Sequence, residues 1–180
     1  MGVFKQPGYV QALHESMGMI EDYPKGIILG QSVVDGGTGM SKTFRDIDLS
    51  KRLEVPVFEK TQMGMAIGLS LAGYWPVISV YPRINFLLEA VGMLCNHLDK
   101  IPVYSDYEPR VIVRTAIPSR LPIDPGPQHL GYYVTGLRGL LKNVEIVELH
   151  STQGIRDKYK KAFKSPRSTI LIEISALYDA

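Results

Sequence analysis

Apolar residues along this chain fall into two patterns, helical spacing and short continuous runs. Helical spacing over residues 10–20 and again over 155–163 predicts an amphipathic helix near each end of the chain. The continuous runs predict buried strands at residues 26–30, 76–80, 110–114, 143–148 and 168–173. Strands that alternate with helices are typical of an α/β fold, and we expect a three-layer sandwich around a mostly parallel sheet.

Two further segments, residues 59–73 and 84–98, are apolar or small on almost every side. A helix without a polar face has to be buried, and for the first of these segments we expect burial against another subunit. Gly64 and Gly68 lie about one helical turn apart on the same face, where each costs about 1 kcal/mol relative to alanine. Close approach of a partner's backbone would compensate for that cost.

Glu59 is a single carboxylate at the start of the first apolar helix, directly after a short apolar stretch at 55–58 that predicts a strand. We expect its side chain to lie near a subunit interface and to be partly desolvated. Desolvation raises the pKa of a carboxyl group, which suits such a group to share a proton with a bound base. The alternative is an ordinary carboxylate that the helix dipole stabilises and that has no functional role.

The longest irregular segment covers residues 116–132 and contains several prolines and His129. A loop of this length inside a compact domain is more often functional than a simple connection. A histidine in such a loop can act as an acid, a base or a substrate contact near neutral pH. The alternative is a loop histidine without a role.

Composition narrows the class of protein. The chain has 180 residues, 45% of them hydrophobic and 21% charged, which fits one globular domain over residues 1–180. A net charge of +2 gives no reason to expect nucleic acid or a membrane surface as a partner. No run reaches the roughly 18 apolar residues of a membrane span, and no secretion signal is recognisable. The single cysteine, Cys95, excludes a disulfide within the chain, so we expect a reducing, cytoplasmic location.

Four motifs follow one another along the chain. They are Asp35-Gly-Gly-Thr-Gly39, Phe58-Glu59 with Gly64 and Gly68 behind it, Ile84-Asn-Phe86, and Gly126-Pro-Gln-His129. With these motifs, nearly the whole chain resembles the pyrimidine-binding domain of thiamine diphosphate enzymes of the transketolase and 2-oxo acid dehydrogenase E1 beta-subunit group. The resemblance implies the thiamine diphosphate-binding fold in its pyrimidine module.

The resemblance also implies roles for individual residues. Glu59 would bind the N1′ nitrogen of the cofactor's aminopyrimidine ring and trade a proton with it, and His129 would be the second catalytic residue. Phe86 would offer a flat face to the ring, a contact worth about 0.5–1.5 kcal/mol beyond area burial. Tyr81 is a second candidate wall of the cofactor site, and Val57 is a candidate apolar support.

The chain departs from the family in what it lacks. Such enzymes hold a divalent metal and the diphosphate with a Gly-Asp-Gly motif and a downstream Asn, and no such pair occurs here. We therefore expect no metal ligand in this chain, and Mg²⁺ held by a diphosphate-binding partner subunit in an α2β2-like hetero-oligomer. We also expect the C-terminal transketolase domain to be absent from this chain. At Gln31 the beta subunits commonly carry a carboxylate.

Two reaction types fit this resemblance. We slightly favour decarboxylation of a 2-oxo acid with transfer of the acyl unit, because the Gly-Gly loop at 35–39 resembles that of the E1 beta subunits. The alternative is transketolase-type transfer of a two-carbon ketol group between sugars, which the motif ending at His129 favours. An alternative of another class is a non-catalytic assembly or regulatory subunit with the same fold. A nucleotide-phosphate cradle at 35–39 is disfavoured, because the loop lacks the Lys-Ser/Thr ending of a P-loop.

Overall fold

The computed structural model describes residues 8–121 and 124–178, so Pro122 of the proline-rich loop lies outside the described residues. Six strands form one sheet in the order β2-β1-β3-β4-β6-β5, and every neighbouring pair is parallel. The strands are β1 (Ile27–Gly30), β2 (Arg52–Glu54), β3 (Val77–Tyr81), β4 (Val111–Ile117), β5 (Glu145–Leu149) and β6 (Thr169–Ile174). The expected α/β fold is confirmed, with a sheet that is parallel throughout.

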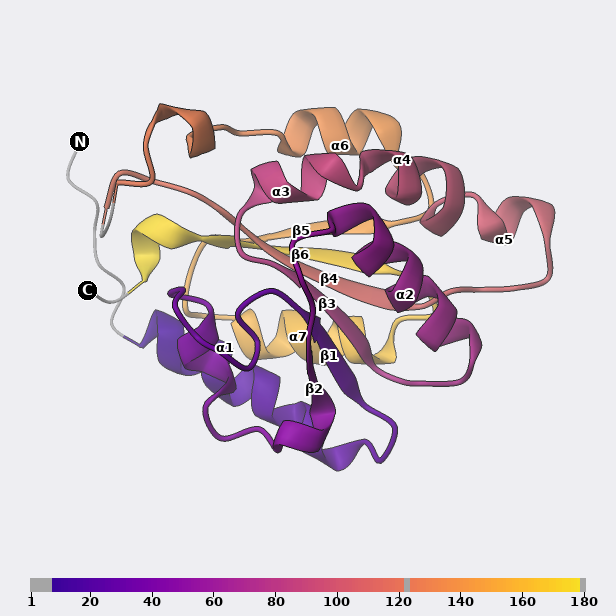
Figure 1. Cartoon of the computed structure of the whole chain (residues 1–180), viewed down its shortest axis with the longest axis horizontal. Coiled ribbons are helices and arrows are strands. Elements are labelled where there is room, and N and C mark those ends of the chain that lie inside the picture. Colours follow the sequence, from indigo (N-terminus) through magenta and orange to yellow (C-terminus); the bar gives the residue numbers. More distant parts are fainter. Residues whose placement is uncertain (1–7, 122–123, 179–180) are drawn as a thin grey trace.

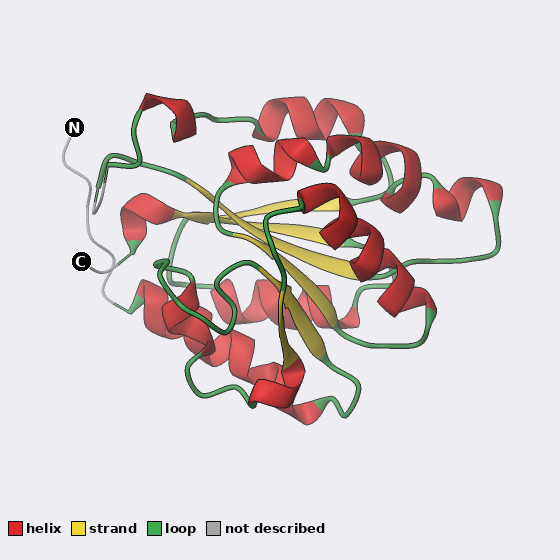
Figure 2. Ribbon diagram, in the orientation of Figure 1, coloured by secondary structure: helices red, strands yellow, loops and turns green. Residues whose placement is uncertain are grey.

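Helices cover both faces of the sheet and give the molecule three layers (Figures 1 and 2). One face carries α1 (Tyr9–Gly18) and α7 (Ile155–Lys164), and the other carries α2 (Glu59–Leu71), α3 (Ile84–Glu89), α4 (Val91–Met93) and α6 (Val134–Leu140). Strand side chains alternate between two cores. Ile112 and Leu171 belong to the core with α1 and α7, whereas Val113 and Ile172 belong to the core with α2, α3 and α6. A parallel sheet is normally buried on both faces in this way.

Short helical turns make up much of the remaining chain. They are α5 (Ile101–Tyr104), the 3₁₀ turns η1 (Met19–Asp22), η2 (Ser41–Phe44), η3 (Leu49–Lys51), η5 (Pro127–His129) and η6 (Ser175–Leu177), and the π-helical turn η4 (Leu94–Leu98). None of the helices in the described ranges is long and apolar enough to cross a lipid bilayer.

Two of the expected elements need correction. Residues 55–58 do not form a strand. The strand of this segment is β2, which ends at Glu54, and the N–H of Val55 makes one last bond to the carbonyl of Gly30 at 3.0 Å. Pro56 follows and has no N–H to continue the pairing.

The segment 84–98 is also not one continuous helix. It is divided at Ala90, whose backbone angles (φ −97°, ψ 6°) separate α3 from α4. It then widens into the π-helical turn, in which the N–H of Asp99 bonds to the carbonyl of Leu94 at 2.9 Å.

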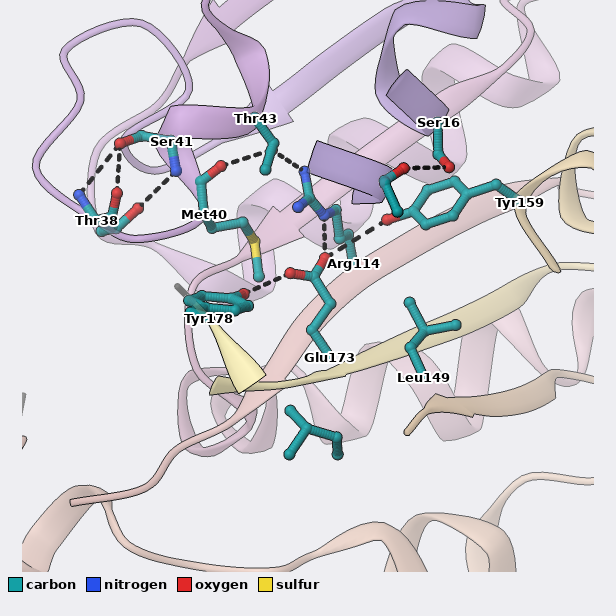
Figure 3. Close-up of polar contacts among 12 residues, drawn as sticks. Ser16, Thr38, Met40, Ser41, Thr43, Arg114, Leu149, Tyr159, Glu173 and Tyr178 are labelled. Carbon is teal, nitrogen blue, oxygen red and sulfur yellow. Dashed lines mark hydrogen bonds and ion pairs between the residues drawn. The ribbon is translucent and has the colours of Figure 1, made fainter. Parts of the chain in front are cut away.

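A buried ionic cluster lies in the core under α1 and α7 (Figure 3). The Arg114 side chain of β4 donates through Nε to Glu173 of β6, and neither side chain has exposed surface. Arg114 also donates through Nη1 to the Thr43 hydroxyl at 2.7 Å, and the Tyr178 hydroxyl donates to Glu173. Burial, together with the Glu173 charge, raises the pKa of Tyr178. The cluster thus ties η2 and the C-terminal segment to the middle of the sheet, on the face away from α2.

Candidate functional site

The candidate site lies at the carboxyl ends of β1 and β3, which are neighbours in the sheet. From β1 the chain continues to β2 on one side, and from β3 it continues to β4 on the other side. In open α/β sheets, a crevice forms where the chain changes direction in this way, and ligands bind there. Gln31 follows β1, Glu59 begins α2, and Tyr81 ends β3, so all three residues border this position.

Glu59 is a nearly buried carboxylate, with 8% of its surface exposed. Its Oε1 accepts a hydrogen bond from Nε2 of Gln31 at 3.2 Å. Its Oε2 accepts no hydrogen bond from any residue of the described ranges. The expected partial desolvation of Glu59 is therefore confirmed within the single chain, and one oxygen is left to receive an external donor.

The first turn of α2 is fixed to the sheet by buried side chains. Tyr81 donates its hydroxyl to the backbone carbonyl of Glu59 at 3.0 Å, and Gln62 donates through Nε2 to Ser79 Oγ at 3.1 Å and to the Val80 carbonyl at 2.9 Å. Burial, and to a smaller extent the charge of Glu59, raises the pKa of Tyr81, so its hydroxyl keeps the proton that it donates. These bonds hold the head of α2 against the end of β3.

Glu54 is a site-supporting residue that reasoning from the sequence missed. Its carboxylate accepts hydrogen bonds from the backbone N–H groups of residues 32–35, at 2.6, 2.8, 2.7 and 3.4 Å. The loop after β1 therefore wraps around the last side chain of β2, and Gln31 is held at the start of that loop. The sequence offered no signal for this role, because β2 has only three residues, Arg52–Glu54, and shows no distinct pattern.

Phe86 and His129 lie against each other although they come from distant segments. Their ring centroids are 5.5 Å apart with an interplanar angle of 70°, an edge-to-face contact. Asn85 places its Nδ2 2.8 Å from Nδ1 of His129. The guanidinium of Arg83 lies 5.7 Å from the centroid of the Phe86 ring. The start of α3 thus holds the imidazole that the proline-rich loop supplies.

A cavity of about 160 Å³ lies beside Arg83, and neither Phe86 nor His129 lines it. The Gly-rich loop at 37–40 and the proline-rich loop form two of its walls, and Arg83 lines it as well. The rest of its lining is Pro82, which follows β3, and Ser175 and Tyr178, which follow β6.

The predicted site residues form two separate groups in the single chain. Tyr81 contacts Glu59, and Phe86 contacts His129, but no hydrogen bond or ring contact joins the two groups within residues 8–121 and 124–178. Tyr81 has no exposed surface, whereas Val57 is 76% exposed. Helices α2 and α3, which carry the two groups, contact each other. A ligand that contacted both Glu59 and Phe86 would therefore have to bridge the groups.

The two groups offer a ligand one hydrogen-bond acceptor and one aromatic face. Glu59 offers one unbonded carboxylate oxygen in the first group, and Phe86 offers a half-buried ring in the second group. In the described part of the chain, no three His, Cys, Asp or Glu side chains lie close enough together to hold a metal.

Comparison with known proteins gives the class of the fold. The parallel sheet and its helices are those of a transketolase-type α/β domain. The structure matches transketolase from Leishmania mexicana with a TM-score of 0.72 and 16% identity, over 91% of this chain and 24% of that one. It matches a split-gene transketolase, described as an inactive beta4 tetramer, with a TM-score of 0.66 and 19% identity, over 93% of this chain and 50% of that one.

The sequence itself is similar to one E1 beta subunit. The chain is 25% identical over 172 residues to the mitochondrial pyruvate dehydrogenase E1 component subunit beta of Chaetomium thermophilum, over 93% of this chain and 44% of that relative. No family model matches the chain. The chain is therefore transketolase-like and E1 beta-like, and it spans half or less of the length of these relatives.

Proposed function

We propose that this chain is the pyrimidine-binding subunit of a split enzyme that depends on thiamine diphosphate. The observation that carries the proposal is Glu59, a nearly buried carboxylate at the head of α2 with one oxygen unbonded. The likeness to an E1 beta subunit and to transketolases supports it. Bound thiamine diphosphate supplies the nucleophilic carbon and the electron sink for cleavage of a bond next to a carbonyl.

Within this proposal, Glu59 holds a proton between its Oε2 and the aminopyrimidine nitrogen of the cofactor. Gln31 donates its hydrogen bond to Oε1 of Glu59, so Oε2 is the oxygen that remains for the ligand. Tyr81 and Gln62 keep the backbone of α2 in place while that proton is shared. A site with little water suits this task, because water would otherwise compete for both groups.

Phe86 and His129 form the opposite part of the proposed site. Phe86 provides an aromatic wall for the aminopyrimidine ring, and Val57 provides an apolar contact that is exposed in the single chain. Tyr81 stays a candidate wall, although its clearest contribution is its bond to Glu59. His129 contacts the substrate through its imidazole ring.

A partner subunit completes the proposed enzyme. This chain has no Gly-Asp-Gly motif, and the partner supplies that motif together with the Mg²⁺ and diphosphate site. The exposed face of α2 supports such an assembly. Gly68 is exposed, no atom of the described residues lies within 4 Å of where its Cβ would be, and Leu71 is 43% exposed.

Two substrate classes fit the proposed enzyme, and we favour a 2-oxo acid whose acyl unit is transferred after decarboxylation. Similarity to an E1 beta subunit supports this choice. Transfer of a two-carbon ketol group from a ketose is the second candidate, which the structural likeness to transketolases supports.

The test is turnover by the assembled enzyme. The full chain is purified with a polypeptide that carries Gly-Asp-Gly and a downstream Asn, and is assayed with thiamine diphosphate, Mg²⁺ and either a 2-oxo acid or a ketose. Glu59→Gln should lower kcat by roughly 10²–10⁴-fold, the range for loss of a proton-transfer group. Sedimentation should show the assembly unchanged.

Glu15→Gln is the matched control, since it makes the same chemical change at an exposed position of α1 on the other face of the sheet. It should leave kcat unchanged. Unaltered turnover in Glu59→Gln would reject the proposal and support a non-catalytic assembly subunit instead.

A further inference from the structure

Asn85 connects the start of α3 to the proline-rich loop. Its Nδ2 lies 2.8 Å from Nδ1 of His129, across 44 positions of sequence. The neighbouring residue, Phe86, meets the same imidazole edge to face at 5.5 Å. Two consecutive side chains of one helix therefore hold the ring of His129 from two sides.

The orientation of the Asn85 amide follows from its surroundings. Its Oδ1 is buried and has no hydrogen-bond partner among the described residues. Turning the amide over would place the NH₂ group at that buried position, where it would leave two N–H groups without acceptors. Buried N–H groups without a partner are rarer than carbonyl oxygens without one, so the orientation with Nδ2 facing His129 is favoured.

We propose that Asn85 is a positioning residue that fixes His129 in the neutral tautomer with its proton on Nε2. An amide N–H can only donate, so Nδ1 of His129 has to offer its lone pair. In a neutral imidazole the proton then lies on the other nitrogen. His129 therefore presents an N–H donor, held in one orientation by Asn85 and Phe86.

The role of this donor in catalysis rests on the function proposed above, whereas the tautomer itself does not. A fixed N–H donor suits an oxygen acceptor, such as the carbonyl or carboxylate oxygen of a 2-oxo acid. It binds and polarises that oxygen, and it does not take a proton from the substrate through Nε2.

The tautomer can be measured in the full chain without cofactor or partner. Two-bond ¹H–¹⁵N spectra of the ¹⁵N-labelled chain, at a pH where imidazole is neutral, report which ring nitrogen is protonated. His129→Gln identifies the signals of His129 among the four histidines. The wild-type chain should show a protonated Nε2 and a bare Nδ1.

Asn85→Asp should reverse this pattern, because a carboxylate only accepts and would draw the proton to Nδ1. Asn96→Asp, the same change at an exposed Asn of η4, is the matched control and should leave the pattern as in the wild type. A wild-type His129 protonated on Nδ1 would overturn the proposal, and so would an unchanged pattern in folded Asn85→Asp.

Kinetics of the assembled enzyme test the consequence for the reaction. Asn85→Asp should lower kcat about a hundredfold with little change in KM. Asn85→Asp should cause no further loss of kcat in a chain that already carries His129→Gln, because Asn85 acts through His129. If the double variant instead lost kcat by the product of the two single losses, the positioning role would be overturned. Turnover that is insensitive to Glu59→Gln would instead reject the proposed function and leave the spectroscopic result standing.

Discussion

The charged side chains of Arg114 and Glu173 are both fully buried in the core, and each neutralises the charge of the other. Their ion pair joins β4 to β6, and Thr43 and Tyr178 occupy further polar atoms of the pair (Figure 3). Even so, Nη2 of Arg114 is buried without a partner in the described residues. Such a pair contributes less by its attraction than it would cost if one partner were removed.

Arg114→Met should therefore lower the free energy of unfolding by about 3–5 kcal/mol, because it leaves the Glu173 charge buried and uncompensated. Arg114→Met combined with Glu173→Leu should recover most of that loss. Urea unfolding of the full chain measures both values. Arg120→Met is the control, since Arg120 forms an exposed pair with Asp124 that is worth about 0–1 kcal/mol. A single variant as stable as this control would contradict the argument.

At the scale of elements, the contact between β1 and β3 sets the geometry of the site. The last residue of β1 is Gly30, which pairs with Val80 in β3. A Cβ built on Gly30 would lie 2.4 Å from the carbonyl oxygen of Val80. Gly30 and Val80 belong to paired strands, so the carbonyl cannot move aside without disturbing β1, which precedes Gln31, and β3, which ends at Tyr81.

Gly30→Ala should consequently destabilise the chain by about 1–3 kcal/mol, the usual cost of overpacking. Thermal unfolding measures the effect. Gly136→Ala is a useful comparison, because this glycine lies in α6 and a Cβ added there would have no atom of residues 8–121 or 124–178 within 4 Å. That change should raise stability by up to about 1 kcal/mol through helix propensity. Equal effects at the two glycines would refute the steric explanation.

At the scale of the whole molecule, helix α2 is packed against the rest of the chain on one face only. Its inner face is buried through Met63, Ala66 and Ile67, but its outer face presents Gly68 and Leu71. A Cβ built on Gly64 would lie 3.5 Å from Cε of Met93, and no other described atom outside the backbone of α2 would lie within 4 Å. The cost of two glycines in this helix is therefore not offset by close packing inside the chain.

Gly68→Gln should separate stability from assembly. In the isolated chain it should raise the free energy of unfolding by up to about 1 kcal/mol, because glycine is a poor helix former. In the presence of the partner it should weaken association by roughly tenfold or more, since the side chain occupies the space that a partner's backbone needs.

Gly18→Gln is the matched control for association, because Gly18 is an exposed glycine with helical angles at the end of α1, on the opposite face. Analytical ultracentrifugation measures association, and chemical denaturation measures stability. Association that is unaffected by Gly68→Gln would show that the partner binds elsewhere.

The sequence alone determined the elements with a strong local pattern. Each of the five predicted buried runs overlaps a strand of the sheet, whereas the short stretch at 55–58 does not, and Glu59 begins its helix as expected. Periodicity is a property of neighbouring residues, so it needs no knowledge of the fold. The helix α6 was not predicted, because Gly136 and Gly139 weaken its local signal and only Val134 and Leu137 are buried.

Tertiary structure alone decided which side chains meet. Glu54 binds the N–H groups of a loop from another strand, Asn85 reaches His129, and Arg114 pairs with Glu173 across 59 positions. Such contacts depend on the order of strands in the sheet, and many orders fit the same alternation of strands and helices. The sequence alone thus identified Glu59 and His129 as candidate site residues. Only the fold showed which polar neighbours orient them, because those neighbours are distant in the sequence.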